Sequence, residues 1–124
     1  MEPLLISLLA LLLIGAGVGK ALADAIAHGS PRLSERGPWW DNTTSWTRKY
    51  KDYYGGDKRP RFVGATTVLV FLTDGWHFFT AVSWACADAA VLVGAWPVYR
   101  WYAVFGIVAR RIVFEPIYQR LRKL

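Results

Sequence analysis

Apolar positions along the chain gather into two long blocks, separated by a polar and aromatic segment. The first block runs from Leu4 to Ala27 and is interrupted only by Ser7, small residues, Lys20 and Asp24. The second block runs from Phe62 to Phe114 and carries few charges. Neither block has the period of a soluble amphipathic helix, and about 20 apolar residues are enough to cross a bilayer core. The pattern therefore predicts an all-α integral membrane protein.

The length of each block predicts three transmembrane helices in a single membrane domain. The second block is too long for one span, and its best break is Gly94-Ala95-Trp96-Pro97, because Pro97 cannot donate an intrahelical hydrogen bond. A turn at Asp74-Gly75 is the alternative, but it would leave a first span of only about a dozen residues. We expect the three helices over about residues 4–28, 62–93 and 98–123 of a domain that covers residues 1–124.

A secretory signal peptide is the rival interpretation of the first block. Small residues at positions 21–25 resemble a cleavage site. However, the leader Met1-Glu2-Pro3 has no basic residue, whereas signal peptides begin with a positively charged region. We therefore favour a retained transmembrane helix.

Basic residues predict the orientation independently. Eight of the 15 Lys and Arg residues lie between Arg32 and Arg61, and five lie at positions 110, 111, 120, 122 and 123. A three-span protein places both groups on one side, and the positive-inside rule makes that side cytoplasmic. We expect an inner-membrane protein with its N-terminus outside. The net charge of +6 then reflects topology and contact with anionic headgroups, so nucleic-acid binding is not expected.

The loop over residues 29–61 is rich in aromatic residues, with three Trp and three Tyr between Pro38 and Tyr54. Disordered segments are poor in aromatics, so this loop is expected to fold, with a short helix Trp46–Tyr53 that Ser45 could cap. One interpretation is an aromatic belt at headgroup depth. The other is a cap in which Arg48, Lys49 and Lys51 bind an anionic headgroup or phosphate.

Ionisable residues inside the apolar blocks are the strongest functional signal, because each is costly in hydrocarbon unless it pairs or faces water. The second predicted helix carries Asp74, His77 and Asp88 within about 60° of one face. The first carries Lys20, Asp24 and His28 at intervals of four. The two polar stripes could meet at the cytoplasmic end of the bundle.

Such a cluster fits a site that binds a cation or an anionic lipid headgroup. Carboxylate and imidazole groups one helical turn apart can share a divalent metal, and a bound metal could activate water for hydrolysis. The candidate metal ligands are Asp24, His28, Asp74 and His77, of which Asp74 and His77 would be catalytic. Lys20, together with the three basic loop residues named above, would bind the headgroup.

Two other functions fit the same residues. An Asp/His chain could relay protons or line a cation path. Alternatively, the chain could be a structural or assembly subunit in which Lys20–Asp74 and Asp88–Arg100 pairs fix the helices. The simplest partner for Lys20 is Asp24, one turn away.

Small residues indicate close helix contacts. Gly15 and Gly19 form a Gly-x-x-x-Gly pair, whose neighbour could be the second helix of the same chain or the first helix of another. Three spans bury little surface, so we expect a homo-oligomer or a membrane-complex partner. Cys86 can form no internal disulfide and is expected to pack in the core. No phosphate-binding glycine loop, nucleophile elbow or zinc-protease motif occurs in the sequence.

A string of motifs resembles a group of small prokaryotic membrane proteins. The motifs are Trp39-Trp40-Asp41, Ser45-Trp46-x-x-Lys49-Tyr50-Lys51 and the run from Arg61 to His77, which includes Thr73-Asp74-Gly75-Trp76-His77. The resemblance covers roughly residues 24–80 and implies that the loop and the start of the second span form one unit. It implies no particular activity. That group has two adjacent histidines where this chain has His28-Gly29, which implies that a metal site here would lack a ligand.

Overall fold

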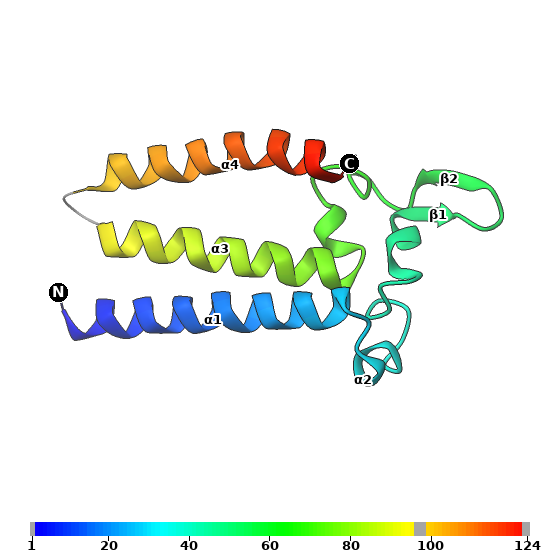
Figure 1. Cartoon of the computed structure of the whole chain (residues 1–124), viewed down its shortest axis with the longest axis horizontal. Coiled ribbons are helices and arrows are strands. Elements are labelled where there is room, and N and C mark those ends of the chain that lie inside the picture. Colours follow the sequence, from blue (N-terminus) through cyan, green and yellow to red (C-terminus); the bar gives the residue numbers. More distant parts are fainter. Residues whose placement is uncertain (1, 96–98, 123–124) are drawn as a thin grey trace.

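The computed structural model describes residues 2–95 and 99–122 as three long helices with a small loop region at one end (Figure 1). The long helices are α1 (Pro3–Ala27), α3 (Gly75–Ala95) and α4 (Arg100–Arg122). The loop region holds the short helix α2 (Pro31–Ser34), the strands β1 (Tyr50–Asp52) and β2 (Asp57–Pro60), and 3₁₀ helices at Ser45–Lys49 and Val70–Leu72. The fold is thus mainly helical, as expected.

Two of the described helices, α1 and α3, are long and apolar enough to cross a membrane. Most of the large apolar side chains of α1 are exposed, Leu4 at 77% and Leu11 at 65% among them, and most of those of α3 are half-buried. A soluble helix buries such residues against a core, whereas a membrane span presents them to lipid. The composition and exposure of both helices are therefore compatible with a membrane protein.

Small residues bring α1 and α3 into close contact. A Cβ atom on Gly19 would lie 3.0 Å from the backbone carbonyl oxygen of Phe79 and 3.0 Å from the backbone nitrogen of Ser83. The Ser83 hydroxyl donates a hydrogen bond of 2.9 Å to the carbonyl of Ala16. At Gly15, a Cβ atom would lie 3.0 Å from the Cys86 sulfur. The neighbour of the Gly-x-x-x-Gly pair is therefore α3 of the same chain, and Cys86 packs at this interface.

Helix α1 ends in a Schellman motif, in which Gly29 adopts a φ of +69°. The N–H of Ser30 bonds the carbonyl of Ala25, and the N–H of Gly29 bonds that of Ile26. The Asn42 side chain also donates to the carbonyl of Ala27 at 3.1 Å. These bonds satisfy the last carbonyls of the helix and attach the loop to its end.

Helix α3 begins at Gly75, so the expectation of a second helix from about residue 62 is wrong. Residues 62–74 instead form turns and a 3₁₀ helix, with Gly64 at a φ of +82°. The apolar run Val68–Leu72 continues the hydrophobic pattern without continuing the helix, because Asp74 caps α3 with its carboxylate. The Asp74-Gly75 boundary, which is the alternative turn within the second apolar block, is where the helix starts.

The loop also differs from expectation. The predicted helix Trp46–Tyr53 is replaced by a 3₁₀ helix that ends at Lys49, followed by the antiparallel hairpin of β1 and β2. Asp41, rather than Ser45, organises the start of this segment, since its carboxylate accepts bonds from the backbone N–H and the hydroxyl of Thr43. These hydrogen bonds lower the pKa of Asp41.

Helix α4 runs antiparallel to α3, so its end returns to the loop region while the start of α1 lies at the opposite end (Figure 1). Its contacts with α3 are sparse compared with those between α1 and α3. The predicted turn at Gly94–Pro97 falls partly on residues 96–98, which lie outside the described residues. The bounds of α4 are close to the expected 98–123.

Candidate functional site

The end of α1, the loop and the start of α3 meet at one point. Ile26 is completely buried, and its Cδ1 atom would lie 2.9 Å from a Cβ on Gly75. The N–H of Gly75 donates a hydrogen bond of 2.8 Å to the carbonyl of Trp39. Only a residue without a side chain fits between Ile26 and the Trp39 ring. This packing places the first turn of α3 beside the last turn of α1.

Aromatic rings cover this junction. Trp39 and Trp40 contact each other at a centroid distance of 4.9 Å, and both contact Phe79, at 5.9 and 5.5 Å. Phe78 lies 5.7 Å from Trp39. Such ring contacts stabilise by about 0.5–1.5 kcal/mol each beyond area burial. The aromatic loop therefore packs on α3, as the prediction that it folds against another element requires.

Asp74 and His77 form a directly hydrogen-bonded pair within this junction. The Asp74 carboxylate, only 2% exposed as a residue, accepts the backbone N–H of His77 on Oδ1 at 2.9 Å. Its Oδ2 atom lies 2.6 Å from Nδ1 of His77 and 3.3 Å from the Thr73 hydroxyl. The carboxylate thus fixes both the backbone and the ring of His77.

Two opposed effects act on the pKa of Asp74, which precedes the first residue of α3. Burial raises the pKa, and the hydrogen bonds from the side chain and backbone of His77 lower it. The hydrogen bonds prevail, so the pKa of Asp74 is lowered from its ordinary value of 3.8. Asp74 is therefore a carboxylate at neutral pH and can orient an imidazole N–H.

The His77 ring is positioned for proton transfer. Its side chain is 31% exposed, whereas that of Asp74 is 3% exposed. In the neutral ring, the proton that binds the Asp74 carboxylate lies on Nδ1, which leaves Nε2 as the acceptor. Trp76 contacts the ring edge at a centroid distance of 4.7 Å. A carboxylate that holds a histidine in this way is the arrangement of a general base.

Lys20 and Asp24 pair with each other rather than with the Asp74–His77 pair. The Lys20 ammonium lies 2.5 Å from the Asp24 carboxylate, with the side chains 67% and 51% exposed. The expected Lys20–Asp74 pair is therefore not formed, because α3 begins at Gly75 and Asp74 sits at the helix end rather than one third of the way along. The simpler i,i+4 pairing within α1 is the one observed.

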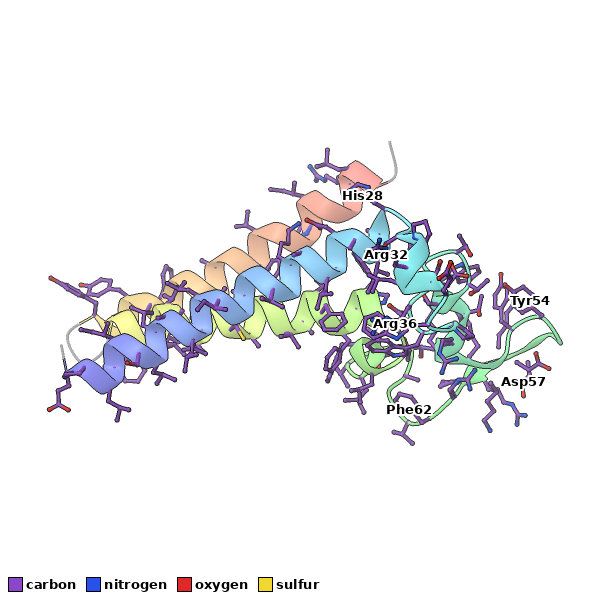
Figure 2. All side chains as sticks on the ribbon, turned by 90° about the horizontal axis from the view of Figure 1, so that it is seen from below. His28, Arg32, Arg36, Tyr54, Asp57 and Phe62 are labelled. Carbon is purple, nitrogen blue, oxygen red and sulfur yellow. The ribbon has the colours of Figure 1, made fainter. Side chains whose placement is uncertain are left out.

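The four predicted metal ligands are not brought together. Asp24 is bonded to Lys20, Asp74 is bonded to His77, and His28 lies exposed at the end of α1 (Figure 2). Within residues 2–95 and 99–122, no three His, Cys, Asp or Glu side chains gather as a metal site would require. The expected set of four ligands is therefore corrected to an Asp–His pair and a separate Lys–Asp pair.

Asp88 lies 11 positions beyond His77 on α3, about 16 Å along the helix axis. It is therefore far from the Asp74–His77 pair even though the three residues share a face. Its expected partner, Arg100, has a side chain outside the described part of the structure. The expected Asp88–Arg100 pair stays a prediction.

Basic residues surround the hairpin of the loop. Lys49 lies over the Tyr50 ring at 5.3 Å, and Lys51 is exposed on β1. Arg48 is partly buried at the end of the 3₁₀ helix. Figure 2 shows Tyr54 and Asp57 at the outer tip of the hairpin, away from the long helices. The three expected headgroup ligands thus lie in one short segment, whereas Lys20 lies on α1.

Sequence reasoning missed the roles of Trp39 and Thr73. Trp39 supplies the carbonyl that accepts the first N–H of α3, and Thr73 places its hydroxyl 2.7 Å from the Val70 carbonyl and next to Asp74. The sequence did carry a signal for the start of α3. Asp74 is followed three residues later by the polar His77, which is the spacing between a helix N-cap and the residue it bonds. The carbonyl of Trp39 has no such signal, because its position depends on the fold of the loop.

Comparisons with protein-family profiles, with curated proteins and with solved structures found no match to this chain.

Proposed function

We propose that this chain is an inner-membrane protein with three spans, α1, α3 and α4, and with the loop region on the cytoplasmic side. The apolar composition of α1 and α3 and the return of α4 to the loop end support this arrangement. The positive-inside rule then places the basic loop on the cytoplasmic side. On that side the loop meets anionic headgroups.

Within that arrangement, the Asp74–His77 pair activates water for the hydrolysis of an anionic lipid headgroup that the basic loop binds. The observation that carries this function is a carboxylate 3% exposed bonded to Nδ1 of a histidine 31% exposed. Nε2 can take a proton from water, and the buried carboxylate stabilises the imidazolium that results. The junction lies at the loop end of α1 and α3, where headgroups would be.

The test uses Asp74→Asn and His77→Gln in the full chain, purified in detergent and given phosphatidylglycerol. The amide at position 74 still accepts the His77 backbone N–H, but it favours the wrong tautomer of the ring. Glutamine at the third helix position can still reach back to the cap. We expect either change to lower the rate of headgroup release by about 10²–10⁴-fold, as measured by phosphorus NMR.

Asp88→Asn is the matched control, because it makes the same chemical change within α3, about 16 Å from His77 along the axis. It should leave turnover within about twofold of the wild type. Turnover that survives in both Asp74→Asn and His77→Gln would refute the proposed site.

A structural role is the second candidate, and the capping geometry favours it specifically. Asp74 satisfies an N–H in the first turn of α3 and holds that turn through His77. A scaffold subunit needs nothing more from this pair. It would show no lipid turnover in the wild type, and Asp74→Ala would disrupt its oligomers in size-exclusion chromatography while Asp74→Asn would not.

A further inference from the structure

The base of the β-hairpin brings two arginines together. The N–H of Arg61 donates to the carbonyl of Lys49 at 2.9 Å, which extends the pairing of the strands by one step. The side-chain Nε of Arg61 donates to the carbonyl of Arg48 at 2.5 Å. The Arg61 side chain therefore lies against the Arg48 backbone, and the hairpin register fixes the two residues as neighbours.

The charge of these two arginines is not balanced within the described residues. The nearby Asp57 is occupied by Arg59, which binds both of its carboxylate oxygens, at 2.9 and 2.8 Å. No carboxylate lies within ion-pair distance of Arg48 or Arg61 in the part of the chain that the structure describes. Two neighbouring arginines without an acid attract an anion.

Arg48 also has an unsatisfied donor. Its Nε atom is buried from water and has no hydrogen-bond partner among the described residues. Buried donors in folded proteins are nearly always paired, so an isolated one calls for an explanation, and a bound acceptor group is one that also fits two arginines without an acid. The fork of N–H groups in a guanidinium matches the oxygens of a phosphate.

We propose that Arg48 and Arg61 form a binding site for a phosphate group, and that the phosphate is that of an anionic lipid headgroup. The lipid source rests on the proposed membrane function, because the loop region then lies at headgroup depth. This assignment replaces the broader set of Arg48, Lys49 and Lys51 by a pair that includes Arg61. The remaining lysines add charge but not the fork geometry.

Arg48→Gln is the main test, because no described hydrogen bond uses the Arg48 side chain and its loss should not disturb the fold. Arg59→Gln is the matched control: it removes the same charge from the same loop region, but at a guanidinium already held by Asp57. Binding of short-chain phosphatidylglycerol to the full chain in detergent would be measured by calorimetry, with thermal unfolding to verify each variant. Phosphatidylcholine serves as the zwitterionic comparison.

We expect Arg48→Gln to weaken phosphatidylglycerol binding about tenfold or more, as the loss of charge-assisted hydrogen bonds implies, and Arg59→Gln to change it by less than about twofold. Arg61→Gln should match Arg48→Gln. Equal losses in Arg48→Gln and Arg59→Gln would mean that net charge alone binds the lipid, and the site would be rejected.

Inorganic phosphate distinguishes the source of the ligand. If millimolar phosphate leaves lipid binding unchanged, the lipid assignment is supported. If phosphate binds as tightly as phosphatidylglycerol and competes with it, the lipid assignment is overturned. Asp74→Asn should keep wild-type binding at this site, so a failure of the Asp74–His77 chemistry and a failure of the arginine pair give different results.

Discussion

At the scale of single residues, the charge of Asp74 links the stability of the folded state to pH. Its lowered pKa means that the folded state prefers the carboxylate. The stability it contributes is therefore fully present above its unfolded pKa of about 4, and is lost as the pH falls through the lower folded value. This contribution to stability comes from the charge of the carboxylate and not from the shape of the side chain.

We therefore expect the difference in thermal stability between the wild type and Asp74→Asn to be largest above about pH 4 and to shrink as the pH falls toward about 3. Asparagine retains the cap but has no proton to lose. Differential scanning fluorimetry in detergent between about pH 3 and pH 7 measures it. A difference that stays constant over this range would show that Asp74 does not act as a carboxylate.

Residue-scale pairings were predictable when the partners lie one helical turn apart. The contacts Lys20–Asp24 and Asp74–His77 have spacings of four and three, and both are observed. Pairings across elements were not predictable, because the expected Lys20–Asp74 contact depended on a helix start that the pattern of apolar residues did not define. The same limit explains why the neighbourhood of Arg48 and Arg61 was missed.

At the scale of elements, the sequence predicted α1 more accurately than α3. Pro3 at the start of a long apolar run and His28-Gly29 after it define the two ends of α1. For α3, the apolar residues Val63 and Val68 suggested helix, yet they are 92% and 80% exposed in turns. Hydrophobicity alone cannot distinguish such a segment from a span, and the short polar strands of the hairpin lack the alternation that would reveal them.

The contact between α1 and α3 gives an element-scale prediction. Gly19→Ala should lower the free energy of unfolding by about 1–3 kcal/mol, because the added methyl meets the backbone of α3. Gly17→Ala is the matched control, since nothing lies within 4 Å of its Cβ position, and it should be neutral or stabilising by up to about 1 kcal/mol. Chemical denaturation in mixed micelles measures both. Equal effects at the two positions would contradict the observed interface.

At the scale of the whole molecule, the proposed crossing by α4 sets the topology. Its 23 residues reach about 34 Å, which is long enough to cross a bilayer core. Its apolar stretch between Arg100 and Arg110 covers only residues 101–109, about 14 Å. If α4 crosses the membrane, Arg110 and Arg111 must be accommodated. They could contact α3 or a second copy of the chain, or their side chains could extend to the membrane–water interface.

The position of the α4 end decides between a crossing and a surface helix. Three spans place the hairpin and the end of α4 on the same side of the membrane, and these two elements hold Tyr54 and Leu121. Single cysteines at each position, in a Cys86→Ser background, would be labelled in intact cells and in inverted vesicles with a membrane-impermeant maleimide. We expect both to react only in inverted vesicles, because both basic groups are then cytoplasmic. If Leu121→Cys reacted in intact cells while Tyr54→Cys did not, α4 would not cross, and the chain would have two spans with its C-terminal helix on the outer surface.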